Sequence, residues 1–355
     1  MITLYPPALL SSVTLVSGEA CAPSNRRLYL SFEDALGALL AAHIKPQAKV
    51  LVPAYYCWSV VHHLERKGFQ VFSYPVGEDL QPDRAALESA LKHHSPQLVI
   101  LFHPLGIEST LKKDLSWTAH LLGEAIVLED YAHRLFSDLD AHPFQRWVAI
   151  NSFRKLSAAE GAWIWGAPHL LGSLPPPAVA LSWYSIKVRS LFILWRAVLQ
   201  TAGLFESQHL FSLSEKLYGL HEELIGASET PQGGSRRDEW LFSRLNGKRL
   251  SAHREKIARI YLEKLRSHQT PKFSLVPIEE DALKDLKFFP VRIQAKDAAG
   301  VLARLSERRV YLDTLYEDSP HSQGFAYLML PLYPTIDEAQ AHTLGEWLHA
   351  EIARE

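Results

Sequence analysis

The chain has 355 residues, of which 47% are apolar and 21% charged, as in an ordinary globular protein large enough for one main domain and a smaller one. The formal net charge of −2 gives no electrostatic basis for binding nucleic acid. Only two cysteines occur, Cys21 and Cys57, so the sequence predicts no disulfide framework and favours a cytoplasmic location. No uncharged apolar run of about 18 residues predicts a membrane span, and residues 1–20 lack the basic start of a signal peptide.

The first half of the chain alternates short apolar runs with longer amphipathic ones. Short runs rich in Val and Ile predict strands at 49–53, 70–76, 97–103, 125–130, 147–153 and 161–166. Apolar residues at helical spacing predict helices at 33–44, 59–69, 83–94 and 114–124. This alternation predicts an α/β fold with a mostly parallel central sheet and helices on both faces. Ligands of such sheets bind at the carboxyl ends of the strands, where His103, Asp130 and Ser152 lie.

The pattern changes after residue 166. An apolar helix is expected at 182–205, packed on the main body or at a subunit contact, with docking on a membrane surface as the alternative. The polar stretch 229–239 is expected to be a linker before a long helix at 239–268. Strands at 287–293 and 325–332 and helices at 297–308 and 336–353 predict a small α/β domain. We therefore expect a large domain at 1–235, with a helical insertion at about 180–230, and a small domain at 236–355.

Several common motifs are absent from the sequence. No GxGxxG follows a strand, and neither GxxxxGK[ST] nor GxSxG occurs. The histidine pairs His62–His63 and His93–His94 are adjacent, so their side chains leave a helix in different directions and predict no metal site.

A lysine and an aspartate follow two neighbouring predicted strands. Lys155 comes three residues after Ser152, and its amine could form a Schiff base if the site is partly shielded from water. Asp130 could hold a proton on a pyridine ring nitrogen, with His133 at the ring's phenolic oxygen or its face and Ser152 at a phosphate. The alternatives are a lysine in a surface loop, a carboxylate that caps a helix and a histidine packed in the core.

Six segments, in order, resemble the DegT-type family of pyridoxal-phosphate aminotransferases, which are sugar aminotransferases of fold type I. They are KVLVPAYYC, GFQVFSYPV, LVILFHPLGI, AIVLEDYAH, INSFRKLSAAEG and the C-terminal LPLYP. The resemblance covers nearly the whole chain. It implies a fold-type I transferase that binds pyridoxal 5'-phosphate (PLP).

The resemblance also implies a role for each matching residue. Lys155 would be the Schiff-base lysine and proton shuttle, and Asp130 would pair with the pyridine nitrogen. His133 would lie beside the ring hydroxyl. Ser152 would bind the phosphate, and so would Ser31, just before a helix N-terminus whose free N–H groups favour a dianion.

The implied activity is that of a PLP-dependent aminotransferase in sugar biosynthesis. It would transfer an amino group, with glutamate as the expected donor, to a keto group of a sugar nucleotide or a similar acceptor. The small-molecule substrates would bind at a homodimer interface, with no nucleic acid, membrane span or metal involved. The alternative is a non-catalytic family member that acts as a binding or regulatory protein.

Two departures from the family pattern bear on the cofactor site. The family has glycine after the serine, whereas this chain has Phe32, Glu33 and Asp34 where the phosphate would bind. Phosphate binding would require Glu33 to face solvent or to pair with Arg26 or Arg27.

The second departure concerns the aromatic residue that stacks on the ring. Cys57 occupies its position, so neighbouring Tyr56 or Trp58, or else His133, would have to provide the stacking.

Overall fold

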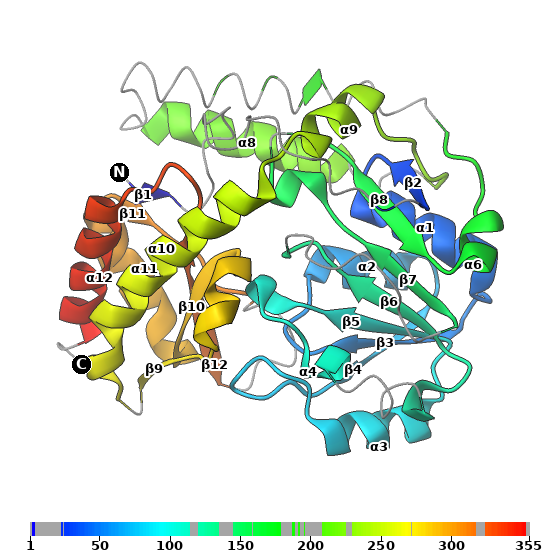
Figure 1. The fold of residues 1–355 in the computed structure, drawn as a ribbon, viewed down its shortest axis with the longest axis horizontal. Helices are drawn as coiled ribbons and strands as arrows, with labels where there is room; N and C mark the ends of the chain where they lie inside the picture. The colour runs from blue at the N-terminus through cyan, green and yellow to red at the C-terminus, as the bar shows by residue number, and fades with distance from the viewer. Residues whose placement is uncertain are drawn as a thin grey trace.

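A seven-stranded sheet and a three-stranded sheet form the two parts of the molecule, at the right and the left of Figure 1. The computed structural model describes residues 2–3, 23, 25–113, 120–134, 145–157, 159–178, 187–188, 191, 195, 208–224, 229–270, 272–316 and 324–352.

The large sheet has the strand order β2-β8-β7-β6-β5-β3-β4. Strands β3 to β7 are parallel, whereas β8 runs antiparallel to both of its neighbours. The strand bounds are Arg26–Tyr29 (β2), Lys49–Pro53 (β3), Gln70–Tyr74 (β4), Leu98–Phe102 (β5), Ile126–Asp130 (β6), Trp147–Ile150 (β7) and Ala162–Gly166 (β8). The predicted mixed α/β fold with a mostly parallel sheet is therefore confirmed.

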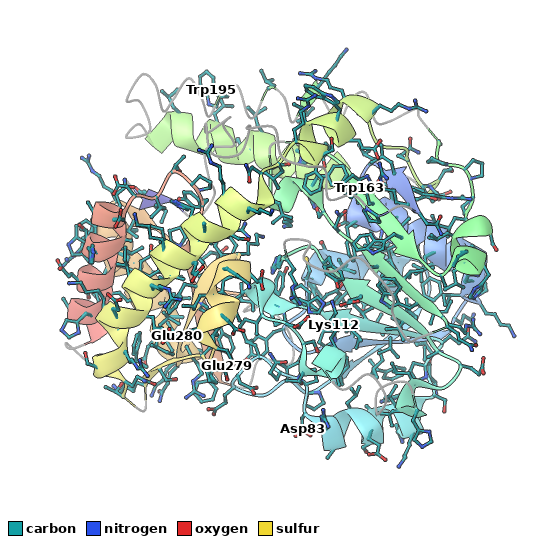
Figure 2. All side chains as sticks on the ribbon, in the orientation of Figure 1. Asp83, Lys112, Trp163, Trp195, Glu279 and Glu280 are labelled. Atoms are coloured by element: carbon teal, nitrogen blue, oxygen red, sulfur yellow. The ribbon has the colours of Figure 1, made fainter. Side chains whose placement is uncertain are left out.

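Both faces of this sheet are buried, as expected of parallel strands. Alternate strand residues enter two separate apolar clusters. One cluster includes helices α1 (Phe32–His43) and α2 (Trp58–Arg66). The other includes α3 (Arg84–His94) and continues into the smaller part of the molecule, so one apolar core joins the two parts. The side chain of Asp83 caps α3 by accepting from the Ala86 N–H, and it lies on the outside of the molecule (Figure 2).

The smaller part is an antiparallel sheet of order β12-β10-β9 with three helices. Its strands span Phe273–Leu275 (β9), Phe288–Gln294 (β10) and Phe325–Pro331 (β12). Strands β10 and β12 lie close to the predicted ones, whereas β9 was not predicted. Its helices span Gly247–Leu265 (α10), Ala295–Glu307 (α11) and Glu338–Ile352 (α12), and a short parallel pair joins β1 (Ile2–Thr3) to β11 (Val310–Tyr311). Short helical turns complete the described chain: η1 (Pro104–Gly106), α4 (Thr110–Lys113), η2 (Phe153–Lys155), α6 (Pro168–Gly172), η4 (Arg266–His268) and η5 (Glu280–Asp285).

The connection between the parts differs from the prediction in its long helix, and its linker is bonded to the large part. The helix predicted at 239–268 is two helices, α9 (Arg236–Ser243) and α10, because Asn246 caps a new start by accepting from the Arg249 N–H. The predicted linker 229–239 is not free of the large sheet. Its Gln232 N–H donates to Asp34, and its carbonyl accepts from the Leu30 N–H.

The predicted helix at 182–205 and residues 114–119 of the helix predicted at 114–124 lie almost entirely outside the described residues. Of the expected insertion at 180–230, the structure describes α8 (Gln208–Leu224), which lies at the top of Figure 1. Within the described part of the chain, no helix has the length and apolar character needed to span a bilayer.

Candidate active site

The strand directions bring the loops that carry the candidate residues to one edge of the large sheet. Strands β3, β5, β6 and β7 all end there, and antiparallel β8 begins there. The segments that follow or precede these ends carry Tyr56, His103, Asp130, Lys155 and Glu160. Residues separated by about a hundred positions in sequence are thus placed side by side by parallel pairing alone.

Asp130 is the last residue of β6 and is only 3% exposed. Its Oδ2 accepts a 2.7 Å hydrogen bond from the Tyr56 hydroxyl, and its Oδ1 accepts one of 2.8 Å from the Ala132 N–H. Burial raises the pKa of Asp130 to about 7, against the opposing effects of these hydrogen bonds and of the Lys155 charge. A cation bound beside this carboxyl would restore its ionised form.

Lys155 ends η2, directly after β7, the strand that pairs with β6. It is partly buried, and its N–H bonds the Ser152 carbonyl. Its charge lowers the pKa values of Asp130, His133 and Lys287, so all three side chains lie within electrostatic range of its amine. We call Asp130, Lys155 and His133 the Asp–Lys–His centre.

His133 is buried in the same place as a neutral ring. Burial, with the Lys287 and Lys155 charges, holds its pKa well below the ordinary value. Its Nδ1 accepts from the Leu105 N–H at 3.2 Å, so the proton of the neutral ring is on Nε2, which lies 3.4 Å from the Tyr316 hydroxyl. The rings of His133 and Tyr316 are nearly parallel, 16° apart, with centroids separated by 6.1 Å.

Ser31 lies at the N-terminus of α1, where the sequence places it, but its hydroxyl is already engaged. It accepts from the Asp34 N–H at 3.0 Å and donates to Asp34 Oδ2 at 2.7 Å. The other carboxylate oxygen of Asp34 accepts from the Gln232 N–H. Burial raises the pKa of Asp34 to about 6. This end of α1 is therefore capped by the chain itself.

Glu33 neither faces solvent nor pairs with Arg26 or Arg27, so neither arrangement that would make room for a phosphate here is found. It is 6% exposed, and its Oε1 lies 3.8 Å from Nη2 of Arg154 and accepts from the Ser59 hydroxyl at 3.4 Å. Arg26 pairs instead with Glu239, and Arg27 donates to backbone carbonyls. The Glu33 charge raises the pKa of Asp130, so this carboxylate belongs to the same site.

The other predicted cofactor residues also lie at this edge. Ser152 is buried directly after β7, and within the described chain its hydroxyl has no hydrogen-bond partner. Cys57 is the N-cap residue of α2 and is only partly buried, with its sulfur 3.2 Å from the Ser59 hydroxyl. Tyr56 supports Asp130 and packs edge-on against Phe102, so the parallel ring near the centre is Tyr316 and not Tyr56.

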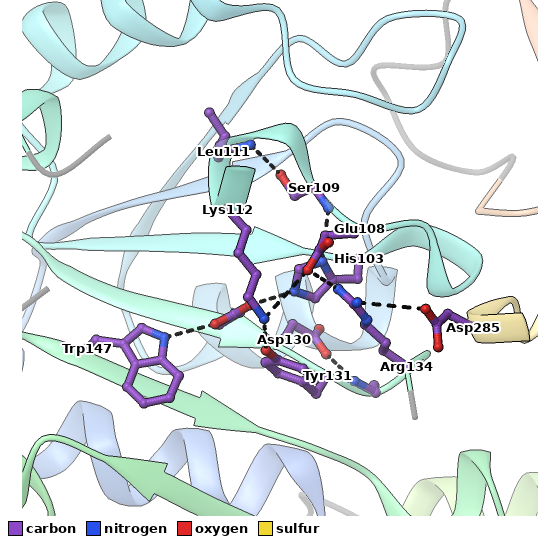
Figure 3. A network of polar contacts seen from close by, with 12 residues as sticks. His103, Glu108, Ser109, Leu111, Lys112, Asp130, Tyr131, Arg134, Trp147 and Asp285 are labelled. Carbon is purple, nitrogen blue, oxygen red and sulfur yellow. Dashed lines mark hydrogen bonds and ion pairs between the residues drawn. The ribbon is translucent and has the colours of Figure 1, made fainter. Parts of the chain in front are cut away.

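A buried polar network supports the centre from the other face of the sheet (Figure 3). Glu129, next to Asp130, points to the opposite face because side chains alternate along a strand. Its carboxylate bonds His103 Nε2 at 2.8 Å and accepts from the Trp147 indole at 3.0 Å, and Lys112 lies 3.5 Å away. The two adjacent acids thus have different tasks, since Glu129 anchors structure and Asp130 faces the centre.

Sequence reasoning missed Tyr316, Lys287, Arg154 and Arg254 as residues of this region. Tyr316 and Lys287 come from the smaller part of the chain, and Arg254 from α10. No spacing or motif relates them to Lys155, so only the fold could have identified them. Arg154 is adjacent to Lys155, but no pattern in the sequence indicates that it would pair with Glu33.

Comparisons with known proteins find likeness in structure alone. No family model matches the sequence, and no curated protein matches it. The S. venezuelae protein DesV is similar at a TM-score of 0.61 and 15% identity, covering 95% of this chain and 87% of that one. Aspartate aminotransferase from Thermotoga maritima is similar at a TM-score of 0.61 and 12% identity, and the match covers 92% of this chain and 76% of that one. Histidinol-phosphate aminotransferase from Sinorhizobium meliloti, solved with pyridoxal-5'-phosphate, is similar at a TM-score of 0.52 and 14% identity. The match covers 93% of this chain and 77% of that one.

Sequence identities this low establish a common fold and do not establish a common reaction. The seven-stranded sheet, its helices and the smaller α/β part correspond to those structures along nearly the whole chain. The chain therefore has the fold of the fold-type I aminotransferases.

Proposed function

We propose that the protein is a PLP-dependent aminotransferase of the DegT type, with Lys155 as the residue that carries the cofactor. The observation that supports this most directly is the meeting of Lys155 and Asp130 at the ends of the neighbouring strands β7 and β6. An amine that can bind an aldehyde and a carboxylate that can hold a ring proton are the two groups that a pyridine aldehyde requires.

The residues at the ring end fit the cofactor. When bound, PLP supplies an electron sink that stabilises negative charge at the substrate carbon. Asp130, with its pKa near 7, would ionise beside a protonated ring nitrogen and hold the proton there, while Tyr56 keeps its Oδ2 in place. The neutral His133 offers its Nε2–H and its ring face, and the Lys155 amine would move the proton at the substrate carbon.

With Glu33 in its present position, the residues near the N-terminus of α1 do not fit the phosphate of the cofactor. A dianion beside a buried carboxylate would be repelled, and the cap formed by Ser31 and Asp34 uses one of the N–H groups of α1. Phosphate binding here requires the Glu33 carboxylate to leave Arg154, whose guanidinium would then face the anion. Ser152, with its unengaged hydroxyl, is the residue best placed to assist.

The position of Glu33 also favours a second candidate, a non-catalytic protein that has kept the fold. In that case the carboxylate of Glu33 takes the place of the cofactor's phosphate and pairs permanently with Arg154. The centre would then serve to bind another ligand.

An absorption spectrum separates the two candidates. The aminotransferase is expected to be yellow as purified or after addition of PLP, and borohydride should fix the cofactor to the peptide that contains Lys155. The Lys155→Ala variant should lose the colour while unfolding at the temperature of the wild type, and Lys284→Ala, an exposed lysine of η5, should keep it. Protein that stays colourless with excess PLP would support the non-catalytic candidate.

The finer features of the proposal come from the resemblance in sequence. The amino donor is proposed to be glutamate and the acceptor a keto group of a sugar nucleotide or a similar compound. The protein would act in the cytoplasm as a homodimer, with domains at 1–235 and 236–355. Screening glutamate with keto sugar nucleotides, and measuring the mass in solution, tests these points separately.

A further inference from the structure

Two cations of the smaller part of the chain, one buried and one partly buried, lie near the Asp–Lys–His centre, and no described residue is a counter-ion to either. They are Arg254, on α10, and Lys287, between η5 and β10. The charge of Lys155 acts on Lys287, and so does that of Arg254, which places the three cations in one neighbourhood. Within the part of the chain that the structure describes, neither Arg254 nor Lys287 forms an ion pair.

Arg254 is 4% exposed, which is rare for an arginine without a partner. Its Nε and Nη1 are buried and make no hydrogen bond. The carboxylate that acts on it most is that of Asp285, but the ion pair of Asp285 is with Arg134, at 4.0 Å. Burial lowers the pKa of Arg254 to about 10. A buried, unpaired guanidinium is costly unless a ligand completes its hydrogen bonds.

Lys287 is held in this place by its backbone. Its N–H donates to the Leu105 carbonyl at 2.7 Å, in the loop whose Leu105 N–H bonds His133. Its amine lies 4.8 Å from the centroid of the Phe288 ring. Burial, and then the charges of Lys155 and Arg254, hold the pKa of Lys287 well below its ordinary value, and an anion bound beside this amine would favour its charged form.

We propose that Arg254 and Lys287 form an anion subsite that binds a carboxylate of the ligand handled by Lys155. A dicarboxylate amino donor has the required chemistry: one carboxylate meets the guanidinium and the other lies within reach of the amine. That the occupant is the amino donor rests on the proposed aminotransferase function. The binding of an anion by the two side chains does not rest on it.

Calorimetry with glutarate tests the subsite, because this dicarboxylate has no amino group to transfer. Purified protein should bind glutarate, and Arg254→Met and Lys287→Met should each weaken binding by about tenfold or more. Arg259→Met, on the same helix but paired with exposed Glu280 (Figure 2), should bind as the wild type does, and so should Lys284→Met. Inorganic phosphate is titrated in parallel to separate a carboxylate site from a phosphate site.

Thermal unfolding gives a second measurement that an ordinary structural arginine would not match. Without ligand, Arg254→Met should unfold at the same temperature or about 2 °C higher, since it removes an unpaired buried charge. Glutarate should raise the unfolding temperature of the wild type and leave that of the variant unchanged.

The possible results separate this inference from the proposed function. If the protein is colourless and its glutarate affinity depends on both cations, the proposed subsite is supported and the proposed aminotransferase function is contradicted. If the protein is yellow and its glutarate affinity is the same in all variants, the proposed subsite is overturned and the proposed aminotransferase function is supported. Phosphate that binds in place of glutarate, with the same dependence on Arg254, overturns the assignment to a carboxylate.

Discussion

The Tyr56 hydroxyl donates a 2.7 Å hydrogen bond to Oδ2 of Asp130, between side chains that are 2% and 3% exposed. Tyr56 follows β3 and Asp130 ends β6, and β5 lies between these strands in the sheet. The hydrogen bond fixes the orientation of a carboxyl group whose pKa burial raises to about 7. The consequences of this relationship for stability and for ligand binding can be measured.

Asp130→Asn should change how stability depends on pH. Because the pKa of Asp130 rises from 3.8 to about 7 on folding, the folded protein binds the proton more tightly, and stability is lost as pH rises from about 4 to 7. Asparagine has no charge to bury. The free energy of unfolding of cofactor-free Asp130→Asn, measured relative to that of the wild type, should therefore increase by about 4 kcal/mol between pH 4 and pH 8.

Urea unfolding at a series of pH values measures this difference. Asp34, with a raised pKa of about 6, contributes to the slope of both proteins and cancels in the comparison. Asp83→Asn, which replaces an exposed cap by an equally good one, should give a curve parallel to that of the wild type. A parallel curve for Asp130→Asn would mean that the carboxyl group does not titrate as described.

Glu33→Gln should strengthen the binding of phosphorylated ligands. The change removes the carboxylate that lies 3.8 Å from Arg154 and leaves that guanidinium for an incoming dianion. We expect the affinity for PLP to rise about tenfold, which corresponds to about 1.4 kcal/mol, and the affinity for pyridoxal, which has no phosphate, to stay the same.

Titrations of both ligands by absorbance or calorimetry measure this ratio. Glu65→Gln, on the exposed side of α2, is the control and should bind both ligands as the wild type does. Equal gains for PLP and pyridoxal would show that Glu33 acts on the ring and not on the phosphate.

Gly106→Ala should destabilise the junction between the two parts of the molecule. Gly106 has φ +95°, and a Cβ there would lie 2.2 Å from the Asp285 carbonyl oxygen and 2.9 Å from the Lys287 nitrogen. Both contacts are with backbone, which cannot move aside as a side chain can. We expect a loss of about 3 kcal/mol in the free energy of unfolding.

Gly123→Ala is the matched control for Gly106→Ala. Gly123 also has a positive φ, of +53°, but a Cβ there would meet nothing within 4 Å. Its alanine variant should lose only about 1 kcal/mol of unfolding free energy, which is the cost of a positive φ for a residue with a Cβ. If denaturant unfolding gives equal losses for the two variants, steric contact with the Lys287 segment is not what requires glycine at 106.

His221→Ala should weaken the attachment of α8 to the active-site edge. His221 Nε2 and Glu160 Oε2 lie 2.6 Å apart, and both side chains are almost fully buried. Removing one partner of a buried hydrogen bond that involves a carboxylate should cost about 2–3 kcal/mol. His62→Ala breaks an exposed pair with Glu65 and should change the stability by less than about 0.5 kcal/mol. Similar costs for both variants would contradict the role given to burial.

Some of the site could be read from the sequence because its members follow strands directly. Val-rich and Ile-rich runs locate the strands, and parallel pairing then places Asp130 and Lys155 at one edge without knowledge of any side-chain contact. The family resemblance supplied the roles for these residues, and the fold it implies is the one found. Helix boundaries were accurate where a cap was recognisable, as at Asp83.

Other features depend on contacts between distant segments. Whether Glu33 points to solvent or to Arg154 depends on how α1 and η2 lie against each other, and Arg154 was not among the partners considered from the sequence. The break at Asn246 could have been found, because Asn246 followed by Gly247 is a turn signal, but the helical pattern on both sides of it was given more weight.

The sequence by itself determined the α/β architecture and the candidate pair of Asp130 and Lys155, because strand periodicity and position along a strand are local properties. Only the tertiary structure decided that Glu33 is buried beside Arg154 and that Arg254 is buried without an ion pair to any described residue. The physical reason is that burial and pairing of a charge are set by what the rest of the chain brings near it, which no local pattern records.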